Sequence, residues 1–240
     1  MKRKSIVVLS VSLLVMMGIG YSLNEFSSAR SVQLFGNIVP KVDTDDKVVA
    51  LTFDDGPGEF TDDILAILNA KGIKATFYLT GLEIEQDFAA AERIVEEGHE
   101  VGNHSYSHPR MVFKSPSFIE IEVEQTDQLI RSIGYEGDIH FRPPYGKKLV
   151  FLPYYLSKGD RKTIMWSIEP ESYPDVADDA DLIVEHVVEQ IEPGSIILLH
   201  VMYESRIESL KAVEGIVTEL EELGYTFQTV SELLEYEMEG

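Results

Sequence analysis

The stretch VVALTFDDGP, residues 48–57, joins an apolar run to a sharp turn and is the most informative part of the chain. Its first six residues, Val48–Phe53, predict a short strand. Asp54 and Asp55 follow directly, and Gly56-Pro57 turns the chain. Adjacent carboxylates at a strand end point in divergent directions, so one can bind a metal ion while the other handles a proton. Because Asp-Asp-Gly-Pro is also a common turn sequence, the rest of the chain must decide between these interpretations.

Apolar runs like this one recur along the chain and alternate with amphipathic stretches. The other strand-like runs are Ala75–Leu79, Glu100–Gly102, Ile139–Phe141, Thr163–Met165, Ser195–Leu199 and Thr226–Thr229. Helical periodicity lies between them, in Ile64–Leu68, Ile119–Ile133, Ile183–Ile191 and Ile216–Leu223. This alternation predicts one α/β domain with a parallel sheet, either a barrel or a doubly wound sheet. The seven runs are one fewer than a regular barrel has.

The N-terminal segment differs from the rest of the chain. Lys2, Arg3 and Lys4 precede Ile6–Leu23, which carries no charge. This pattern is typical of an export signal, and its length approaches the roughly 20 apolar residues that span a membrane. A buried helix of a cytosolic domain is the alternative. The expected order is a signal peptide or N-terminal membrane anchor (1–29, with a small-residue cleavage site at Ser27-Ser28-Ala29), a linker (30–46) and the folded domain (47–240).

The composition excludes several classes of function. The chain has 42 acidic and 20 basic side chains, and its formal net charge is −22. Nucleic-acid binding through phosphates and docking on an anionic membrane both require clustered Lys and Arg, so this balance argues against both. The 44% hydrophobic content argues against disorder. The chain contains no cysteine, which excludes disulfides, thiolate metal sites and a cysteine nucleophile.

A pair of histidines follows the third predicted strand, in GNHSYSHP, residues 102–109. His104 and His108 are four residues apart, so on a helical turn they face the same way and can hold one cation. Such a pair alone is more often structural than metal-binding. With Asp55 it becomes a two-histidine, one-carboxylate site with open positions for water.

Two more predicted strands end in polar residues, within FRPPYG (141–146) and IILLH (196–200). The two prolines make a rigid loop that fixes Arg142 and Tyr145. An arginine can hold a carboxylate in a bidentate pair and keep it ionised. His200 emerges from a buried strand, which suits a general acid or base. A structural arginine and a structural histidine at the rim are the alternatives. In α/β folds the chemistry lies at the carboxyl ends of the strands, so these residues are the candidates for it.

Together, and in this order along the chain, these stretches resemble the polysaccharide deacetylase family, the NodB-homology carbohydrate esterases. The matching motifs cover residues 47–240 and are TFDDGP, ATFYLTG, GHEVGNHSYSHP, FRPPYG, MWSI, PGSIILLH and GYTFQTVSELL. The resemblance implies a single domain folded as a deformed (β/α) barrel with about seven parallel strands. It also implies metal-dependent removal of acetyl groups from an N-acetylated or O-acetylated sugar.

The resemblance implies a role for each matching residue. Asp54 would be the general base, positioned by Arg142, and His200 would be the general acid. The metal ligands would be Asp55, His104 and His108. The acetyl site would be formed by Tyr145 (whose backbone N–H helps bind the oxyanion), Trp166 and Leu198. The expected metal is a divalent ion, with zinc best suited to this donor set and cobalt, nickel or manganese as alternatives.

The sequence departs from the family after Trp166. Family members commonly carry Asp-Trp where Ser172-Tyr173 stands, and that Asp partners the catalytic histidine; Val201 also replaces a common acidic residue. Without this partner we expect a lower pKa and a looser orientation for His200. The residues that could substitute are Glu169, Glu171 and Asp175. We further hypothesise that the sugar groove is reshaped by Tyr173, Tyr203 and Arg206.

The leading hypothesis is an exported, metal-dependent deacetylase of N-acetylated polysaccharides such as peptidoglycan or chitin. It would be extracellular, cell-wall-facing or anchored to the outer face of the cytoplasmic membrane, with no nucleic-acid partner and no protein partner implied. The alternatives are O-deacetylation of xylan or an exopolysaccharide, and a catalytically weak carbohydrate-binding relative, against which the intact Asp54 argues. Phosphoryl transfer is disfavoured because no glycine-rich phosphate loop is present. The histidines expected to be structural or exposed are His99, His140 and His186.

Overall fold

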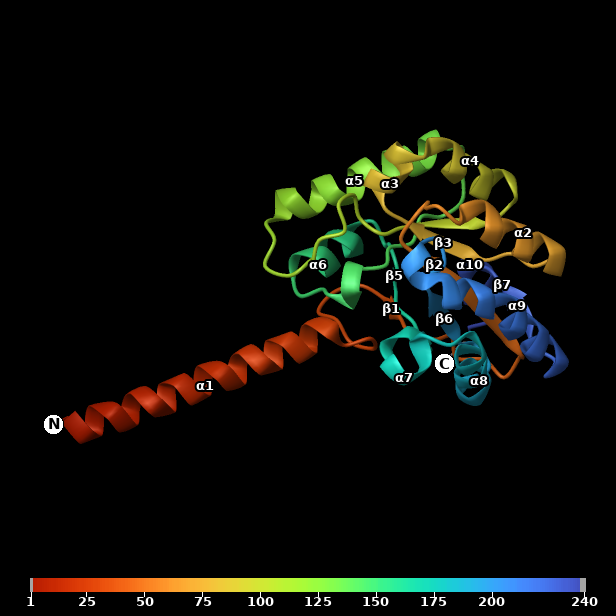
Figure 1. Cartoon of the computed structure of the whole chain (residues 1–240). Coiled ribbons are helices and arrows are strands. Elements are labelled where there is room, and N and C mark those ends of the chain that lie inside the picture. The colour runs from red at the N-terminus through yellow and green to blue at the C-terminus, as the bar shows by residue number, and fades with distance from the viewer. Residues whose placement is uncertain (1, 238–240) are drawn as a thin grey trace.

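Short parallel strands form the centre of the protein, and helices surround them (Figure 1). The computed structural model describes residues 2–237. The strands are β1 (Ile38–Val39), β2 (Val48–Asp54), β3 (Thr76–Leu79), β4 (Glu100–Asn103), β5 (Thr163–Ile164), β6 (Ile196–Leu199) and β7 (Thr226–Gln228). The α-helices are α1 (Lys2–Ser28), α2 (Thr61–Lys71), α3 (Gly81–Gln86), α4 (Phe88–Glu96), α5 (Pro116–Ser132), α6 (Phe151–Lys158), α7 (Pro174–Ala177), α8 (Ala180–Gln190), α9 (Ile207–Glu222) and α10 (Val230–Leu234). The 3-10 turns are η1 (Pro144–Gly146), η2 (Pro170–Ser172) and η3 (Glu204–Arg206).

The strands close into a deformed barrel. β2 lies at the centre and pairs in parallel with β3, β6 and β7, and β3 pairs with β4. Phe141 continues the ring, because it bridges Asn103 of β4 and Thr163 of β5. Ile168, shortly after β5, completes the ring by bridging Ile197 of β6. The predicted α/β fold is therefore confirmed, in its barrel form.

The seven predicted strands are not all present as strands. Six of them correspond to β2 through β7. The stretch Ile139–Phe141 was expected as a strand, but only Phe141 makes sheet bridges there. A strand cannot extend beyond Arg142, because Pro143 and Pro144 have no N–H to donate to a neighbouring strand. The four helices predicted from periodicity are present as α2, α5, α8 and α9, whereas the helices missed have four to nine residues, too few to show a repeat.

Side chains alternate along β2 and divide it into two faces. The odd-numbered residues, ending at Phe53, belong to the hydrophobic cluster that includes residues of α2, α8 and α9. The even-numbered residues Val48 and Ala50 belong to a second cluster with Trp166, in the interior of the barrel. The period of two therefore places Asp54, the last residue of β2, on the interior face at the mouth of the barrel.

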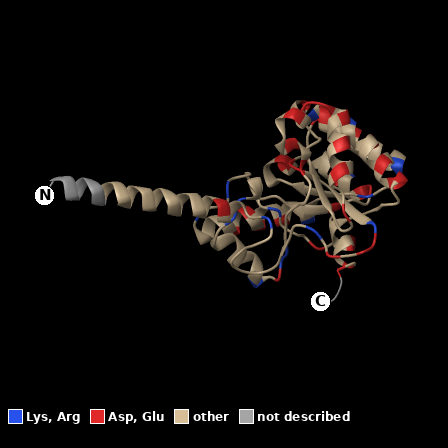
Figure 2. Cartoon of the chain, turned by 90° about the horizontal axis from the view of Figure 1, so that it is seen from below, with Lys and Arg blue, Asp and Glu red and all other residues tan. Residues whose placement is uncertain are grey.

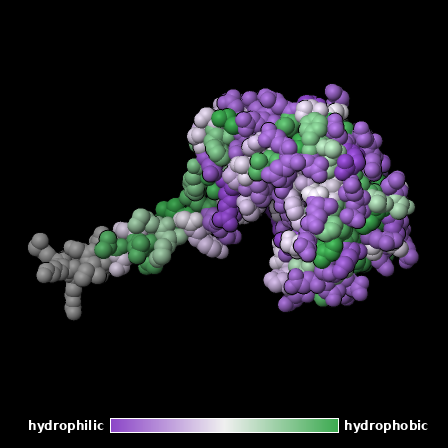
Figure 3. Space-filling model, turned by 45° about the horizontal axis from the view of Figure 1, so that its top comes forward, coloured by the Kyte–Doolittle hydropathy of each residue, from purple (hydrophilic) through white to green (hydrophobic). Residues whose placement is uncertain are grey.

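The N-terminal helix α1 projects from the body as a single rod (Figure 1). Figure 2 shows no charged residue over most of its described length, and Figure 3 shows its apolar surface. Its stretch Leu9–Ser28 has a mean hydropathy of 1.3 and is long and apolar enough to cross a membrane.

The segment expected as a linker, residues 30–46, is not a free tether. Within it β1 pairs with β5 in parallel, and Val42 is 1% exposed. The packed part of the chain therefore begins before residue 47. A two-residue strand is too short to produce a periodic pattern, which is why the sequence did not reveal it.

Candidate active site

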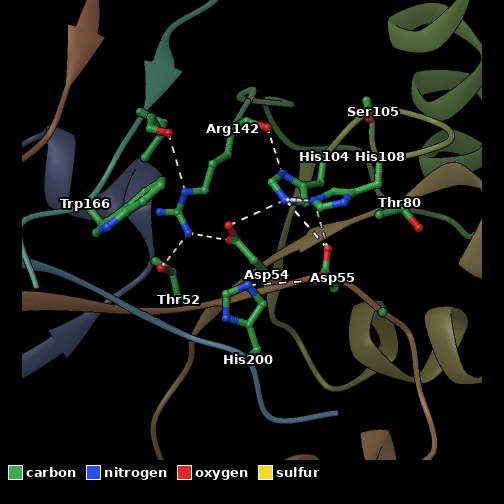
Figure 4. Close-up of polar contacts among 12 residues, drawn as sticks. Thr52, Asp54, Asp55, Thr80, His104, Ser105, His108, Arg142, Trp166 and His200 are labelled. Carbon is green, nitrogen blue, oxygen red and sulfur yellow. Dashed lines mark hydrogen bonds and ion pairs between the residues drawn. The ribbon is translucent and has the colours of Figure 1, made fainter. Parts of the chain in front are cut away.

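Asp54 lies at the mouth of the barrel and is paired with a buried arginine (Figure 4). Arg142 Nη1 donates to Asp54 Oδ1 at 2.6 Å and to Thr52 Oγ1 at 2.8 Å. Arg142 Nη2 donates to the Met165 carbonyl at 3.1 Å, and its guanidinium stacks 4.0 Å from the centre of the Tyr78 ring. Every side of this guanidinium is thus occupied, so one orientation of the Asp54 carboxylate is fixed.

The surrounding charges keep Asp54 ionised. Burial is the largest single influence and would raise the pKa of its carboxyl, but Arg142, His104 and His200 together outweigh burial, and Arg142 contributes the most among them. The net effect is a pKa below the ordinary value of 3.8. Because Arg142 takes Oδ1, Oδ2 is the oxygen that faces the neighbouring histidine, 3.6 Å from His104 Nε2.

Asp55, His104 and His108 converge on one point beside Asp54 (Figure 4). Asp55 Oδ1 lies 3.3 Å from His108 Nε2 and 3.7 Å from His104 Nε2, and the two Nε2 atoms are 3.2 Å apart. His104 Nδ1 donates to the Arg142 carbonyl at 2.7 Å, which leaves a lone pair on Nε2. Burial, followed by the neighbouring His104, lowers the pKa of His108 to about 4, so this ring is neutral near pH 7.

This cluster fits a divalent cation. Among the described residues, Asp55 Oδ1 is a buried acceptor with no hydrogen-bond donor. Two imidazole lone pairs and one carboxylate oxygen, all within 4.8 Å of one another, are a donor set typical of a metal site with open positions. The residues present therefore suit the metal that the sequence predicted.

The loop that carries Asp55 is fixed by its backbone. Asp55 and Gly56 have φ values of 67° and 87°. Glycine adopts this positive φ at Gly56 without strain, and a Cβ there would also displace the tip of the Met202 side chain. Glu83, on α3, accepts a hydrogen bond from Gly56 N at 2.7 Å, and its other oxygen accepts one from the Tyr203 hydroxyl.

A second buried carboxylate holds the loop between the two histidines. Glu122, on α5, is 5% exposed. One of its oxygens accepts hydrogen bonds from Tyr106 N at 3.0 Å and Ser107 N at 2.8 Å, and the other accepts one from Ser107 Oγ at 2.6 Å. The position of His104 and His108 therefore depends on a residue of a helix that does not touch the cluster itself.

His200 has a charge partner after all. Its Nδ1 lies 2.5 Å from Glu171 Oε2, and its backbone N–H donates to Glu171 Oε1 at 2.9 Å. Ser209 Oγ also donates to Glu171, which is 3% exposed. Burial alone would lower the pKa of His200, but the Glu171 carboxylate reverses this and raises it to about 9. The expected loss of a partner, with a lower pKa, is therefore wrong: Glu171, one of the three candidates, occupies the place.

These groups open into a cavity of about 680 Å³. The predicted site residues that line it are Asp54, Asp55, His104, His108, Tyr145, Trp166, Leu198 and His200. Arg142 does not line it and lies fully buried beneath Asp54. Tyr145 has a φ of 57°, and its ring stands 4.6 Å from that of His108.

The groove residues proposed from the sequence divide into two groups. Tyr203 and Arg206 line the cavity. Tyr173 does not line this cavity; it is 53% exposed and its ring lies 4.7 Å from that of His186. Ser28 and Arg30 also line the cavity and were missed, because the sequence placed them in an export signal and a linker.

The remaining histidines lie outside the cavity. His99 and His140 are 3% and 8% exposed, and burial lowers the pKa of each. His99 Nδ1 accepts a hydrogen bond from Ala75 N at 3.2 Å. These positions agree with the structural role expected for them.

Comparison with known proteins identifies related chains. The family model described as polysaccharide deacetylase matches residues 41–158. A peptidoglycan-N-acetylglucosamine deacetylase of Bacillus cereus is 30% identical over 86% of this chain and 97% of its own length. The peptidoglycan-N-acetylmuramic acid deacetylase PdaA of Bacillus subtilis is 30% identical over 90% and 80%.

The fold is shared with solved structures. The crystal structure of the Bc1960 peptidoglycan N-acetylglucosamine deacetylase superposes with a TM-score of 0.77 and 30% identity, covering 83% of this chain and 94% of that one. Both sequence and structure thus agree with the resemblance carried by the strand-end motifs, and this chain belongs to the polysaccharide deacetylase family.

Proposed function

We propose that this polysaccharide deacetylase is metal-dependent and hydrolyses the acetamido group of N-acetylated sugars in a peptidoglycan-like or chitin-like polymer. The observation that carries the proposal is the arrangement at one cavity of a metal-type cluster, an ionised Asp54 and a protonated His200. Amide hydrolysis needs these three functions: an electrophile for the carbonyl oxygen, a base for water and an acid for the leaving nitrogen.

Asp55, His104 and His108 would hold the divalent ion, for which zinc suits the donor set best and cobalt, nickel or manganese are alternatives. When bound, such an ion supplies a Lewis acid for the acetyl carbonyl and lowers the pKa of water from near 16 toward about 7. The hydrogen bond from His104 Nδ1 to the Arg142 carbonyl keeps Nε2 turned toward the cluster.

Asp54 is the proposed general base. Its Oδ1 is held by Arg142, and the depressed pKa keeps it unprotonated at neutral pH. It takes one proton from the attacking water as the new C–O bond forms at the acetyl carbon. The charge pair with Arg142 also prevents the carboxylate from rotating away from the reacting water.

His200 is the proposed general acid. With Nδ1 bound to Glu171 and a pKa of about 9, the ring is protonated at neutral pH, so Nε2 carries a proton. Nε2 points to the cluster, 3.9 Å from Asp55 Oδ2. As the C–N bond breaks, His200 gives this proton to the sugar nitrogen, and the products are acetate and a free amine.

The substrate and location are part of the proposal. Trp166 and Leu198 would form the wall against the acetyl methyl group, and the cavity of about 680 Å³ has room for a sugar residue. The names of the relatives favour peptidoglycan as the polymer. The apolar helix α1 supports an exported protein that faces the cell wall.

The test is acetate release from N-acetylglucosamine oligomers by the full chain. We compare wild type, Asp54→Asn and chelator-treated wild type with zinc restored. We expect Asp54→Asn to lose at least about 10³-fold in kcat and the chelated protein to recover activity with zinc. Acetate from O-acetylated xylan alone would favour the ester-cleaving alternative. Metal binding without acetate from any glycan would contradict the proposal and favour a carbohydrate-binding role.

A further inference from the structure

The end of helix α1 is built into the domain rather than attached to it. The junction segment, Asn24–Arg30, contains the last turn of α1 and the two residues that follow. Ser27 is 4% exposed, and its carbonyl accepts a hydrogen bond from Lys148 N at 2.9 Å. The Lys147 ammonium donates to Asn24 Oδ1 at 2.9 Å and also contacts Ser28 Oγ. Cations and donors at a helix C-terminus satisfy its free carbonyls, so these lysines fix the direction in which α1 leaves.

Lys148 depends on the junction segment in return. Its side chain is 1% exposed, and its ammonium donates to the Ala29 carbonyl. Burial and the neighbouring Lys147 lower the pKa of Lys148 to about 8, and no carboxylate counters these effects in the described part of the chain. A buried ammonium without an acceptor is strongly unfavourable. Removing Ala29 would therefore leave this group unsatisfied.

Arg30, the last residue of the junction segment, lines the cavity. Its Nη2 donates to Glu169 Oε2 at 2.7 Å, and its guanidinium lies 4.7 Å from the centre of the Trp166 ring. The same Glu169 oxygen accepts a hydrogen bond from Trp166 Nε1 at 2.8 Å. Arg30 thus holds the indole from its face and, through Glu169, from its edge.

From these contacts we infer that the junction segment forms part of the active-site wall that substrate binding needs, and that Arg30 is a positioning residue for Trp166. The inference rests on the deacetylase function proposed above. It follows that the active protein keeps residues 24–30 instead of losing part of them at the small-residue site Ser27-Ser28-Ala29. The cavity, which Ser28 and Arg30 line, would then lie where helix α1 meets the domain. Figure 1 shows this end of α1 against the body.

The test compares Arg30→Ala with a matched control, Arg93→Ala, in the detergent-solubilised full chain. Both arginine side chains are 40% exposed and form an ion pair, at 2.7 Å for Arg30 and 2.8 Å for Arg93, but Arg93 pairs with Asp62 and does not line the cavity. For N-acetylglucosamine oligomers we expect Arg30→Ala to raise KM about tenfold, the effect of one lost charge-assisted contact. Its kcat should stay within about twofold, whereas a merely structural loss would lower kcat and leave KM alone.

Trp166 provides a second measurement, because it is the single tryptophan in the chain. We expect Arg30→Ala to shift its fluorescence to longer wavelength, Arg30→Lys to restore part of the emission and of KM, and Arg93→Ala to change neither. Arg30→Ala with the KM and emission of Arg93→Ala would overturn the inference. Absence of acetate with the wild-type protein would instead reject the proposed function, and the emission would still report on the Arg30 contact.

The retained segment is tested on active protein expressed with its own N-terminus in a host that exports it. Mass spectrometry of the fraction that releases acetate should show residues 24–30 present. An equally active form that begins at residue 30 or later would overturn the inference.

Discussion

At the scale of single residues, burial disfavours the charged form of both catalytic candidates, and the charged groups beside each one determine its protonation state. Desolvation disfavours the charged form of Asp54 and of His200 alike. Neighbouring charges reverse this, with Arg142 the main one beside Asp54 and Glu171 the main one beside His200, so the base is held ionised and the acid is held protonated. Near neutral pH Asp54 is therefore an anion that can accept a proton, and His200 is a cation that can donate one. A general base and a general acid that act in the same reaction require these protonation states.

The Glu171 contact predicts the alkaline limit of activity. A histidine with a pKa of about 9 is protonated below that pH and loses its proton above it, so wild-type kcat should fall above about pH 9. In Glu171→Gln, burial is no longer balanced by this carboxylate, so the alkaline limb should move to lower pH and kcat should drop about 10–100-fold at neutral pH. The pH dependence of kcat for acetate release measures both effects.

Asp175→Asn is the control for this prediction, because Asp175 lies in the same region of the chain but is exposed and was an alternative partner by sequence. It should leave the profile unchanged. An unmoved alkaline limb in Glu171→Gln would show that Glu171 does not set the His200 pKa.

The buried ion pair predicts a large effect on stability. Arg142→Leu should destabilise the domain by about 3–5 kcal/mol, because it leaves the 3% exposed Asp54 carboxylate without its cation. Urea unfolding measures the free energy. The double variant Arg142→Leu/Asp54→Leu should recover part of this loss, and a double variant less stable than Arg142→Leu would contradict the explanation.

At the scale of elements, helices hold the loops that carry the metal-type cluster. Glu83 on α3 fixes the loop after β2, and Glu122 on α5 fixes the loop after β4. The strands place each loop at the mouth of the barrel, whereas these carboxylates set the position of the side chains within it. A helix residue remote from the reacting groups therefore controls their geometry.

The Glu122 contacts predict a change in metal affinity. Glu122→Ala frees Tyr106 N, Ser107 N and Ser107 Oγ, so the histidine loop loosens. We expect zinc affinity to fall about 10–100-fold by isothermal titration calorimetry, the range for residues that support metal ligands. Glu120→Ala, an exposed position on the same helix, should bind zinc as wild type does. Equal affinities in the two variants would exclude this role for Glu122.

At the scale of the whole molecule, the acidity belongs to the surface more than to the site. The net charge is −22, and Figure 2 shows acidic residues spread over the helices of the body, whereas most of the described length of the long apolar helix carries none. A domain of this charge repels anionic polymers and meets neutral or cationic glycans more readily. Such long-range effects are screened beyond a Debye length of about 10 Å at 0.1 M salt.

The charge therefore predicts a salt-dependent substrate preference. At low ionic strength, kcat/KM should be higher on partly deacetylated, cationic oligomers than on carboxymethylated ones of the same length, and added salt should narrow the difference. Initial rates over a salt series measure it. A steep fall in activity as cationic charge is added to the substrate at low salt would contradict the prediction.

The pattern of strands and helices by itself determined the α/β class and most of the residues at the mouth of the barrel, whereas the barrel form was implied only by the family resemblance. The strand-end motifs could be read because parallel strands all end at one edge, so local patterns around Asp54, His104, Arg142 and His200 converge without knowledge of the loops. The period of two along β2 also explains why Asp54 faces the interior. These are consequences of short-range order, which a linear pattern records.

Only the tertiary structure decided which groups complete these residues. Glu171 reaches His200 across 29 positions of sequence, and Arg30 reaches Glu169 across 139. Such pairs depend on how turns and the two-residue strand β1 pack against the barrel. These elements are too short to produce a periodic pattern in the sequence. The side chain that holds the acid and the segment that walls the cavity are therefore set by packing between distant parts of the chain, which local sequence does not encode.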